Sequence, residues 1–288
     1  MAAIRLQMKK RANPGNAMFQ YAYLKQLQSR LDDAELTGYQ IPMFGLSSQK
    51  IELPGRVLSI DGGHKHSFEH LGTLFKRRVY DSLSFAGYVQ RLEFYPDRAA
   101  FGAHFRCPDD LDFPTLSRSQ LLINVRGSEI LTAFHPDYGP VPISYYRHIA
   151  ERTKLEPVIM GQLGDDAYSE AIRRAFSGCK FLPHVSPLID FETIRHAVNI
   201  VVSVSTFSWL AAWLSEAAET IHMPIKGLFH PQQRGDVDLV PVGDARYQFY
   251  VFPVERWKAT EAQLQALVSS EDGYEWRTHA DVRELIQY

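Results

Sequence analysis

The feature that most constrains the fold is the alternation of short apolar runs with segments of helical length. Strand-like runs occur at 4–8, 56–60, 120–126, 157–162, 180–185 and 199–205. Helix-like segments stand between or after them, beginning at Ala17 and covering 67–81, 168–176, 190–197 and 208–218. This alternation is typical of βαβ units, in which helices connect parallel strands. The sequence therefore predicts an α/β protein with parallel sheet.

The length of 288 residues allows two domains of about 140 residues each. Segment 135–153 begins with prolines and a glycine and then turns helical, so we expect a boundary at its end, between domains 1–150 and 151–288. The last stretch, 259–288, reads as one or two structural helices. Two α/β halves would bind ligands in a cleft between them, at the carboxyl ends of their strands.

Composition narrows the class of function. A net charge of -2 argues against a general nucleic-acid binder. Cys107 and Cys179 lie far apart, which indicates a reducing compartment and no disulfide framework. No signal-peptide pattern and no apolar run of membrane-spanning length occur, so we expect a soluble cytoplasmic protein. The basic stretch 75–80 favours a solvated helix face, which leaves at most a peripheral contact with membranes.

Three positions are candidates for binding phosphate. Gly15 and Asn16 stand between an apolar strand and an apolar helix, where a tight turn and a helix N-terminus can bind an anion. Asn16 can equally be a plain helix cap. Ser205 and Thr206 stand where another strand passes into an apolar helix, again as an anion site or as a cap over a core helix.

The third candidate is Arg126, at the end of strand 120–126. A guanidinium presents a fork of donors that suits phosphate oxygens, and Asn124 lies on the same face of the strand. A structural pair with Glu129 is the alternative. Taken together, the three positions provide what a diphosphate in an interdomain cleft needs, as in a nucleotide-sugar glycosyltransferase.

Two other motifs are set aside. His64, His66 and His70 have no accompanying carboxylate or cysteine pattern, so a loop that passes into a helix is favoured over a metal site. The stretch "GQLGDD" at 161–166 lacks the G-x-G-x-x-G fingerprint and is expected to be a turn with two solvated carboxylates. A dinucleotide-dependent oxidoreductase is thereby excluded.

Three segments resemble those of bacterial α-1,2-fucosyltransferases, glycosyltransferase family 11. "GNAMFQYAYLK" at 15–25 resembles the family's GN-x-M-F-Q-Y-A signature, and "GYVQRLEFY" at 87–95 resembles its GY-F-Q-x-x-x-Y segment. "VSVSTFSWLAAWL" at 202–214 is similar to its S-x-S-S-F-S-W-W-A-A-W-L segment. The segments occur in the family's order, and the resemblance spans about residues 4 to 230.

The resemblance implies a GT-B fold, with two Rossmann-like domains and the donor in the central cleft. It implies inverting, metal-independent transfer of a sugar from a GDP-sugar, typically GDP-fucose, onto a hydroxyl of a bacterial glycan or lipid-linked oligosaccharide, without a cofactor. The first domain would bind the acceptor. In this family pattern Arg126 holds the donor diphosphate together with Ser205, Thr206 and Phe207, while Gly15 and Asn16 lie close to the reacting sugar.

Departures from the pattern leave alternatives open. Asn124 stands where the family usually has His, Gly127 where it has a second Arg, and Glu129 where it has Asp, and "KKRAN" replaces a glycine-rich lead-in. The donor could therefore be another nucleotide sugar, or the protein could be a catalytically silent homologue that binds one. No general base is assigned among the candidates Asp165, Asp190 and Glu129. Asp190 is expected either to contact the nucleobase or to cap a helix.

Overall fold

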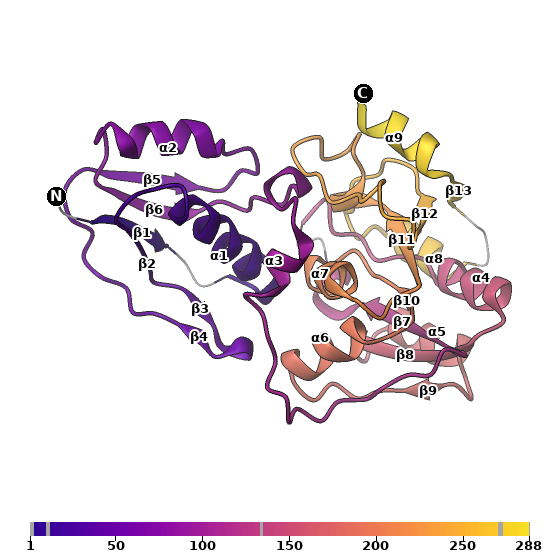
Figure 1. Ribbon diagram of the computed structural model, residues 1–288. Coiled ribbons are helices and arrows are strands. Elements are labelled where there is room, and N and C mark those ends of the chain that lie inside the picture. The colour runs from indigo at the N-terminus through magenta and orange to yellow at the C-terminus, as the bar shows by residue number, and fades with distance from the viewer. Residues whose placement is uncertain (1–2, 10–11, 133–134, 270–272, 288) are drawn as a thin grey trace. The chain divides into compact units, whose positions relative to one another are not determined.

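The chain folds into two compact units. The computed structural model describes residues 3–9, 12–132, 135–269 and 273–287 (Figure 1). The first unit comprises Met1–Cys107 together with the short segment Asp236–Leu239, and the second comprises Pro108–Gly235 and Val240–Tyr288. The basic lead-in at 9–13 includes residues 10 and 11, which lie outside the described residues.

The division falls at residues 107 and 108 and not near residue 150 as expected. Strand β7 (Gln120–Arg126) pairs in parallel with β8 (Glu156–Gln162) and with β10 (Asn199–Val201), so it belongs to the second sheet. Helix α4 (Ile143–Thr153) connects β7 to β8. The segment rich in proline at 135–142 is therefore the loop of a βαβ crossover and not a linker between domains.

The first unit contains a sheet of four parallel strands in the order β2-β1-β6-β5. Leu6, Leu83 and Phe85 of its central strands are fully buried, as parallel strands covered on both faces require. Helix α1 buries residues all round its surface. The elements of this unit are β1 (Ile4–Met8), α1 (Pro14–Gln28), β2 (Ala34–Thr37), β3 (Gln40–Ile41), η1 (Pro42–Phe44), β4 (Leu46–Ser47), β5 (Val57–Asp61), α2 (Phe68–Lys76), β6 (Ser82–Ala86), η2 (Leu92–Phe94) and α3 (Arg98–Gly102).

The second unit contains a seven-stranded sheet in the order β13-β12-β11-β10-β7-β8-β9, with only β13 antiparallel among its described strands. Counted along the chain from β7, the six parallel strands have the order 3-2-1-4-5-6, that of the doubly wound Rossmann fold, and the antiparallel β13 is added at the edge beside β12. Its further elements are η3 (Ser128–Leu131), α5 (Ala167–Ala175), β9 (Lys180–Phe181), α6 (Pro187–Arg195), α7 (Thr206–Leu214), β11 (Thr220–Ile225), η4 (Gly227–Phe229), β12 (Tyr247–Val251), α8 (Glu261–Val268), β13 (Glu275–Arg277) and α9 (His279–Gln287). The expected α/β class with two Rossmann-like domains is confirmed.

The order of the second sheet creates a topological switch point between β7 and β10. From β7 the chain moves outward through α4 and α5 to β9, and from there it returns through α6 to β10 and continues outward on the other side. Because such crossovers are right-handed, the two groups of helices cover opposite faces. Accordingly α6 packs against α7, while α4, α5 and α8 pack against one another (Figure 1).

Several boundaries differ from those expected, each for a local reason. Helix α1 begins at Pro14 and not at Ala17, since proline at the first helical position has a preset φ and no N–H to satisfy. Strand β10 ends at Val201, before the serines. The last stretch contains β13 as well as two helices. No helix in the described part of the chain is long and apolar enough to cross a membrane.

Candidate functional site

The switch point of the second sheet brings two of the predicted positions together. We call the edge at which the parallel strands end the carboxyl edge of the sheet. Arg126 is the last residue of β7, and Ser205 precedes α7 just beyond the end of β10. Ser203 Oγ donates a hydrogen bond of 2.8 Å to Asn124 Oδ1, which joins the two neighbouring strand ends. Ligands of open α/β sheets bind at this place.

Arg126 is held almost buried, with 16% of its side chain exposed. Its guanidinium lies 5.5 Å from the ring centroid of Tyr138, and its Nη2 donates to Glu129 Oε1 at 3.2 Å. The Nε is buried, and no described residue accepts a hydrogen bond from it. Leaving a buried donor of a charged group without a hydrogen bond is unfavourable for the free energy of folding. A bound anion could supply the acceptor that Arg126 lacks.

The pair with Glu129 therefore does form, but it uses one nitrogen of the fork. Glu129 is about half exposed, at 47% of its side chain, and sits in the short helix η3. A partly solvated carboxylate contributes little stability to such a pair. The structural role and the ligand-binding role of Arg126 are compatible.

The backbone around Arg126 is tightly constrained. Gly161 in β8 pairs with Val125 and has a φ of +123°, and a Cβ at this position would lie 2.0 Å from the carbonyl oxygen of Val125. Ser128 has a φ of +54°, which is uncommon for residues other than glycine. Such conformations are retained where the surroundings impose them, often at functional sites.

The motif "GQLGDD" serves the scaffold. Besides Gly161, it provides Asp166, whose carboxylate accepts a hydrogen bond of 2.8 Å from the backbone N–H of Ser169 and so caps α5. Asp165 is exposed. One of the two carboxylates is thus a helix cap and not simply solvated as expected.

The start of α7 provides uncharged donors at the same edge. Ser205 occupies the N-cap position, but its side chain makes no capping hydrogen bond, and its hydroxyl has no partner among the described residues. The N–H groups of Thr206, Phe207 and Ser208 occupy the first turn, where no intrahelical acceptor exists. A hydroxyl and a helix N-terminus facing the same edge as Arg126 can bind phosphate oxygens.

The side chains of Phe207 and Asp190 contact other residues than a phosphate-binding and a helix-capping role would require. The ring of Phe207 packs edge-on against Phe191, with 5.4 Å between centroids, so only its backbone belongs to the anion site. Asp190 does not cap α6: Ser186 does, by accepting from Ile189 N at 3.2 Å. Asp190 instead lies 2.6 Å from Nδ1 of His184. The proposed contact between Asp190 and a nucleobase stays a prediction.

In the first unit, Asn16 is not the helix cap. The N-cap of α1 is Asn13, and Gly15 and Asn16 both lie in the first turn of the helix, Gly15 buried there. The Gly15–Asn16 pair therefore forms no tight turn. Asn16 Oδ1 accepts a hydrogen bond of 2.7 Å from Nε2 of Gln90, which follows β6 at the carboxyl edge of the first sheet. The two residues come from the first two segments that resemble the fucosyltransferase family.

Gln90 is held by a strained neighbour and by a histidine. Val89 is fully buried with a φ of +48°, an outlier for a β-branched residue. The N–H of Gln90 donates to Nδ1 of the buried His64 at 3.3 Å, so His64 has its own proton on Nε2 when neutral. Nothing in the sequence singled out Gln90 or His64 for these roles, although both lie in segments that drew attention.

The three histidines near residue 64 have separate partners. His66 Nε2 lies 2.9 Å from the carbonyl oxygen of Gly62, and the backbone N–H of His70 donates to the hydroxyl of Ser67, which caps α2. Among the described residues, no three histidine, cysteine or carboxylate side chains form a group that could hold a metal ion.

A segment from far along the chain completes this edge. The N–H of Leu92 donates to the carbonyl of Asp238 at 2.8 Å, and the N–H of Asp238 donates to the carbonyl of Gln90 at 3.0 Å. Asp236, 46% exposed, has its Oδ2 at 3.8 Å from Nε2 of His64. This contact joins residues more than 140 positions apart, and no local sequence signal could have shown it.

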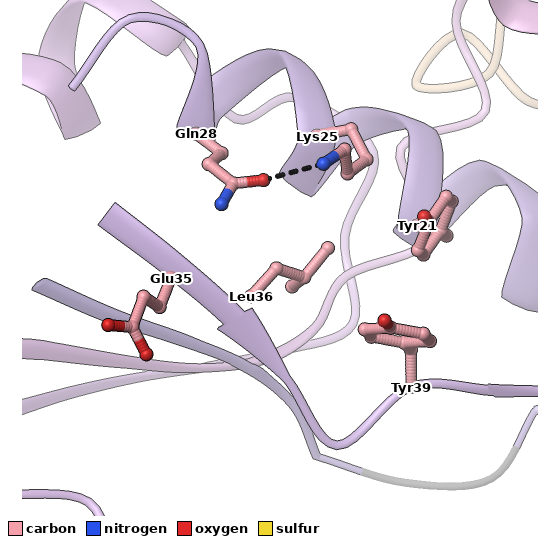
Figure 2. A pocket seen from close by; sticks show the side chains of 6 residues that line it. All are labelled: Tyr21, Lys25, Gln28, Glu35, Leu36 and Tyr39. Carbon is pink, nitrogen blue, oxygen red and sulfur yellow. Dashed lines mark hydrogen bonds between the residues drawn. The ribbon is translucent and has the colours of Figure 1, made fainter. Parts of the chain in front are cut away.

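A pocket of about 290 Å³ lies elsewhere in the first unit, between α1 and the edge strand β2 (Figure 2). Its polar groups largely satisfy one another. Lys25 Nζ donates to Gln28 Oε1 at 2.8 Å, and Gln28 Nε2 donates to the carbonyl of Ala34 at 2.8 Å. Glu35 pairs with Arg5. Neither Asn16 nor Gln90 lines this pocket, so we do not consider it the candidate site.

The course of the chain resembles two solved structures. A mutant of Arabidopsis thaliana FUT1 in complex with GDP is 11% identical, with 90% of this chain and 72% of that chain covered and a TM-score of 0.49. The E. coli heptosyltransferase WaaC with ADP is also 11% identical, with 99% and 97% covered and a TM-score of 0.44. No protein-family model and no curated protein matches the sequence. Similarity at this level concerns the course of the chain and not its chemistry.

Proposed function

We propose that the protein is a glycosyltransferase that takes its sugar from a nucleoside-diphosphate donor. The observation that supports this most is the buried, unpartnered Nε of Arg126 at the switch point of a Rossmann sheet. The free hydroxyl of Ser205 and the first turn of α7 lie at the neighbouring strand end. One cation and several neutral donors at a single edge suit a diphosphate.

These groups would act on the leaving diphosphate. Transfer breaks the bond between the anomeric carbon of the sugar and the phosphate oxygen, and the electron pair of this bond stays on the diphosphate. A new bond forms between the acceptor hydroxyl oxygen and the same anomeric carbon. Attack opposite the leaving group inverts the configuration, and the hydroxyl proton passes to a base or to water. Donors aimed at the growing negative charge contribute about 2.7–4 kcal/mol each, by analogy with oxyanion holes.

We propose GDP-fucose as the donor, because of the resemblance of segments 15–25 and 202–214 to the fucosyltransferase pattern. We also propose that the transfer needs no metal, since Arg126 can neutralise part of the charge that a divalent cation would otherwise offset. The acceptor is a glycan hydroxyl, on a free glycan or a lipid-linked oligosaccharide. Neutral hydrogen-bonding groups such as Asn16 and Gln90 suit sugar hydroxyls.

The test is nucleotide binding by thermal shift. GDP, UDP, CMP and GDP-fucose are compared on the wild type, on Arg126→Ala and on Arg118→Ala. Arg118 is a matched control, since it lies in the same unit, is 79% exposed and precedes the amino end of β7. A ligand at one hundred times its dissociation constant stabilises the fold by about 2.7 kcal/mol, which a melting curve resolves.

We expect GDP and GDP-fucose to raise the melting temperature of the wild type and of Arg118→Ala but not of Arg126→Ala. If UDP or CMP alone raises the melting temperature, the proposal of a glycosyltransferase stands and the proposal of GDP-fucose as the donor is wrong. If no nucleotide shifts the wild type, the proposed function is wrong.

A second candidate is a catalytically silent protein that binds a nucleotide sugar. It is favoured by Glu129, whose carboxylate already occupies one nitrogen of Arg126, and by Gly127, which stands where the fucosyltransferase pattern has a second arginine. Release of GDP from GDP-fucose without acceptor separates the two candidates. Slow hydrolysis that Arg126→Ala abolishes identifies an enzyme, and binding without any hydrolysis or transfer favours the silent protein.

A further inference from the structure

Lys226 is a second cation at the carboxyl edge of the second sheet. It directly follows β11, which lies beside β10 in the sheet. Only 13% of its side chain is exposed, which is rare for a lysine. Nothing in its sequence surroundings, "MPIKGLF", marks it as functional.

The side chain of Lys226 lies against the ring of Phe252 and close to Gly139, with Glu255 and His230 as its titratable neighbours. Its Nζ lies 5.3 Å from the ring centroid of Phe252, and its Cε lies 3.6 Å from where a Cβ on Gly139 would be. Gly227, with a φ of +56°, allows the backbone of Asp137 to come close, since a Cβ there would meet the carbonyl oxygen of Asp137 at 2.3 Å. The loop at 137–139 thus packs closely on the segment that begins at Lys226.

The ammonium of Lys226 lacks a close partner. Its only ion pair in the described part of the chain is with Glu255, at 4.0 Å from Oε2 to Nζ, and Glu255 is half exposed. No described residue accepts a hydrogen bond from it. Burial accordingly lowers the pKa of Lys226, and Glu255 opposes this effect. Burying a charge without hydrogen bonds is unfavourable, unless a ligand supplies them.

A single loop connects Lys226 to Arg126. Tyr138 lies beneath the guanidinium of Arg126, and a Cβ on the next residue, Gly139, would lie 3.6 Å from Cε of Lys226. Asp137 fixes this loop by accepting from Arg234 Nη1 at 3.0 Å and from Gln233 Nε2 at 2.8 Å. In the order β11-β10-β7, the end of β10 lies between the strands that end at the two cations.

We propose that Lys226 is a second cationic ligand of the diphosphate that Arg126 binds. This inference rests on the proposed function. Lysine acts as a point charge toward phosphate, whereas arginine adds a directional fork. Two cations would neutralise a leaving diphosphate more fully than Arg126 alone, part of whose charge Glu129 already offsets.

The experiment titrates inorganic pyrophosphate and GDP into the full chain by isothermal calorimetry. Lys226→Met keeps the nearly buried stem and removes the charge. We expect it to weaken the binding of both probes about tenfold to hundredfold, the usual range for a hydrogen bond to a charged group. The matched control is Lys180→Met, which loses the same charge at the exposed amino end of β9 and should bind as the wild type does.

A second measurement uses the wild type and so does not depend on the folding of a variant. Reductive methylation followed by mass spectrometry should show that pyrophosphate protects Lys226 and leaves Lys180 reactive. If Lys226→Met binds both probes like the wild type while Arg126→Ala does not, or if pyrophosphate fails to protect Lys226, this inference is wrong and the proposed function stands. If the wild type binds neither probe, both are wrong.

Discussion

The carboxyl edges of the two sheets differ in chemistry although both sheets are parallel. In the second unit Arg126 and Lys226 supply positive charge, and the start of α7 adds backbone donors. The edge of the first unit has the amides of Asn16 and Gln90 and the imidazole of His64, and beside them charged groups: Asp61 pairs with Lys9, and Asp236 lies near His64. Charge suits a phosphate, whereas amides suit hydroxyl groups.

Strained backbone occurs at both edges. Val89 adopts a positive φ directly before Gln90, and Ser128 does so two residues after Arg126. In each case a side chain that faces the edge is placed by a conformation that the local sequence does not favour. The two nearly buried cations, Arg126 and Lys226, and not rigidity, therefore distinguish the second edge from the first, and the following variants test that distinction.

The largest effect is expected from Gly161→Ala, which should disrupt the second edge and leave the first intact. The new Cβ would overlap the carbonyl of Val125, at a φ that L-residues avoid. We expect the second unit to lose about 4 kcal/mol or more of its free energy of unfolding. Urea denaturation gives the size, and hydrogen exchange should show faster opening of β7 and β8 than of β1.

Gly178→Ala is the matched control for this variant. Gly178 has a φ of +88°, and no atom lies within 4 Å of where its Cβ would be. Its replacement should therefore cost only the backbone term, about 1 kcal/mol. Equal losses for Gly161→Ala and Gly178→Ala would show that close approach of β7 and β8 does not constrain the site.

Acid is expected to weaken the second unit through His222 in β11. Burial, helped by nearby Arg152, lowers the pKa of His222 to about 4 from 6.5. As the pH falls below about 6.5 the unfolded chain takes up a proton that the folded chain refuses, so stability is lost between about pH 6.5 and 4. The full loss is about 3 kcal/mol, and about 2 kcal/mol by pH 5.

The check is the free energy of unfolding at pH 7 and pH 5, for the wild type and for His222→Gln. The variant should lose about 2 kcal/mol less between the two values, because it has no proton to take up. If the wild type and His222→Gln lose the same free energy of unfolding between pH 7 and pH 5, the acid sensitivity belongs to other groups.

The sequence predicted the regular parts of this fold well, because periodicity reports burial directly. Strands β1 and β7 occupy the expected residues, since each is apolar and covered by helices. Strands β6, β11 and β12 were not predicted, and the boundary at 107 was missed, because membership in a sheet depends on pairing between distant segments. The sequence of a proline-rich loop does not tell whether the loop links two domains or connects two strands of one sheet.

For the candidate site, the sequence identified groups whose chemistry is visible in one residue. Arg126 and Ser205 were named from their place at a strand end. Lys226, Gln90 and His64 were not, because their importance follows from burial and from contacts across the fold. Asn16 was named as a ligand of an anion or, alternatively, as a helix cap, and Pro14 at the first helical position makes Asn13 the N-cap.

A smaller effect is expected from Gln90→Leu in the first unit. The variant removes the donor to Asn16 Oδ1, so the free energy of unfolding should fall by about 1–2 kcal/mol. The affinity for pyrophosphate should stay unchanged, since the second unit supplies the cations. Calorimetry of Gln90→Leu beside Lys226→Met measures this directly, and a comparable loss of affinity in both would remove the distinction between the two edges.

The smallest effect on stability is expected from Ser205→Ala. Helix α6 is capped by the side chain of Ser186, so Ser186→Ala should cost about 1 kcal/mol. Ser205 holds the same position at α7 without a capping hydrogen bond, so its replacement should change stability by less than about 0.5 kcal/mol. Its hydroxyl should instead matter for binding, and Ser205→Ala should weaken pyrophosphate binding about threefold to tenfold. Melting curves and calorimetry on both variants separate the two roles. Should Ser205→Ala destabilise the protein as much as Ser186→Ala and bind pyrophosphate normally, Ser205 would be a structural cap and the α7 N-terminus would lose its hydroxyl ligand.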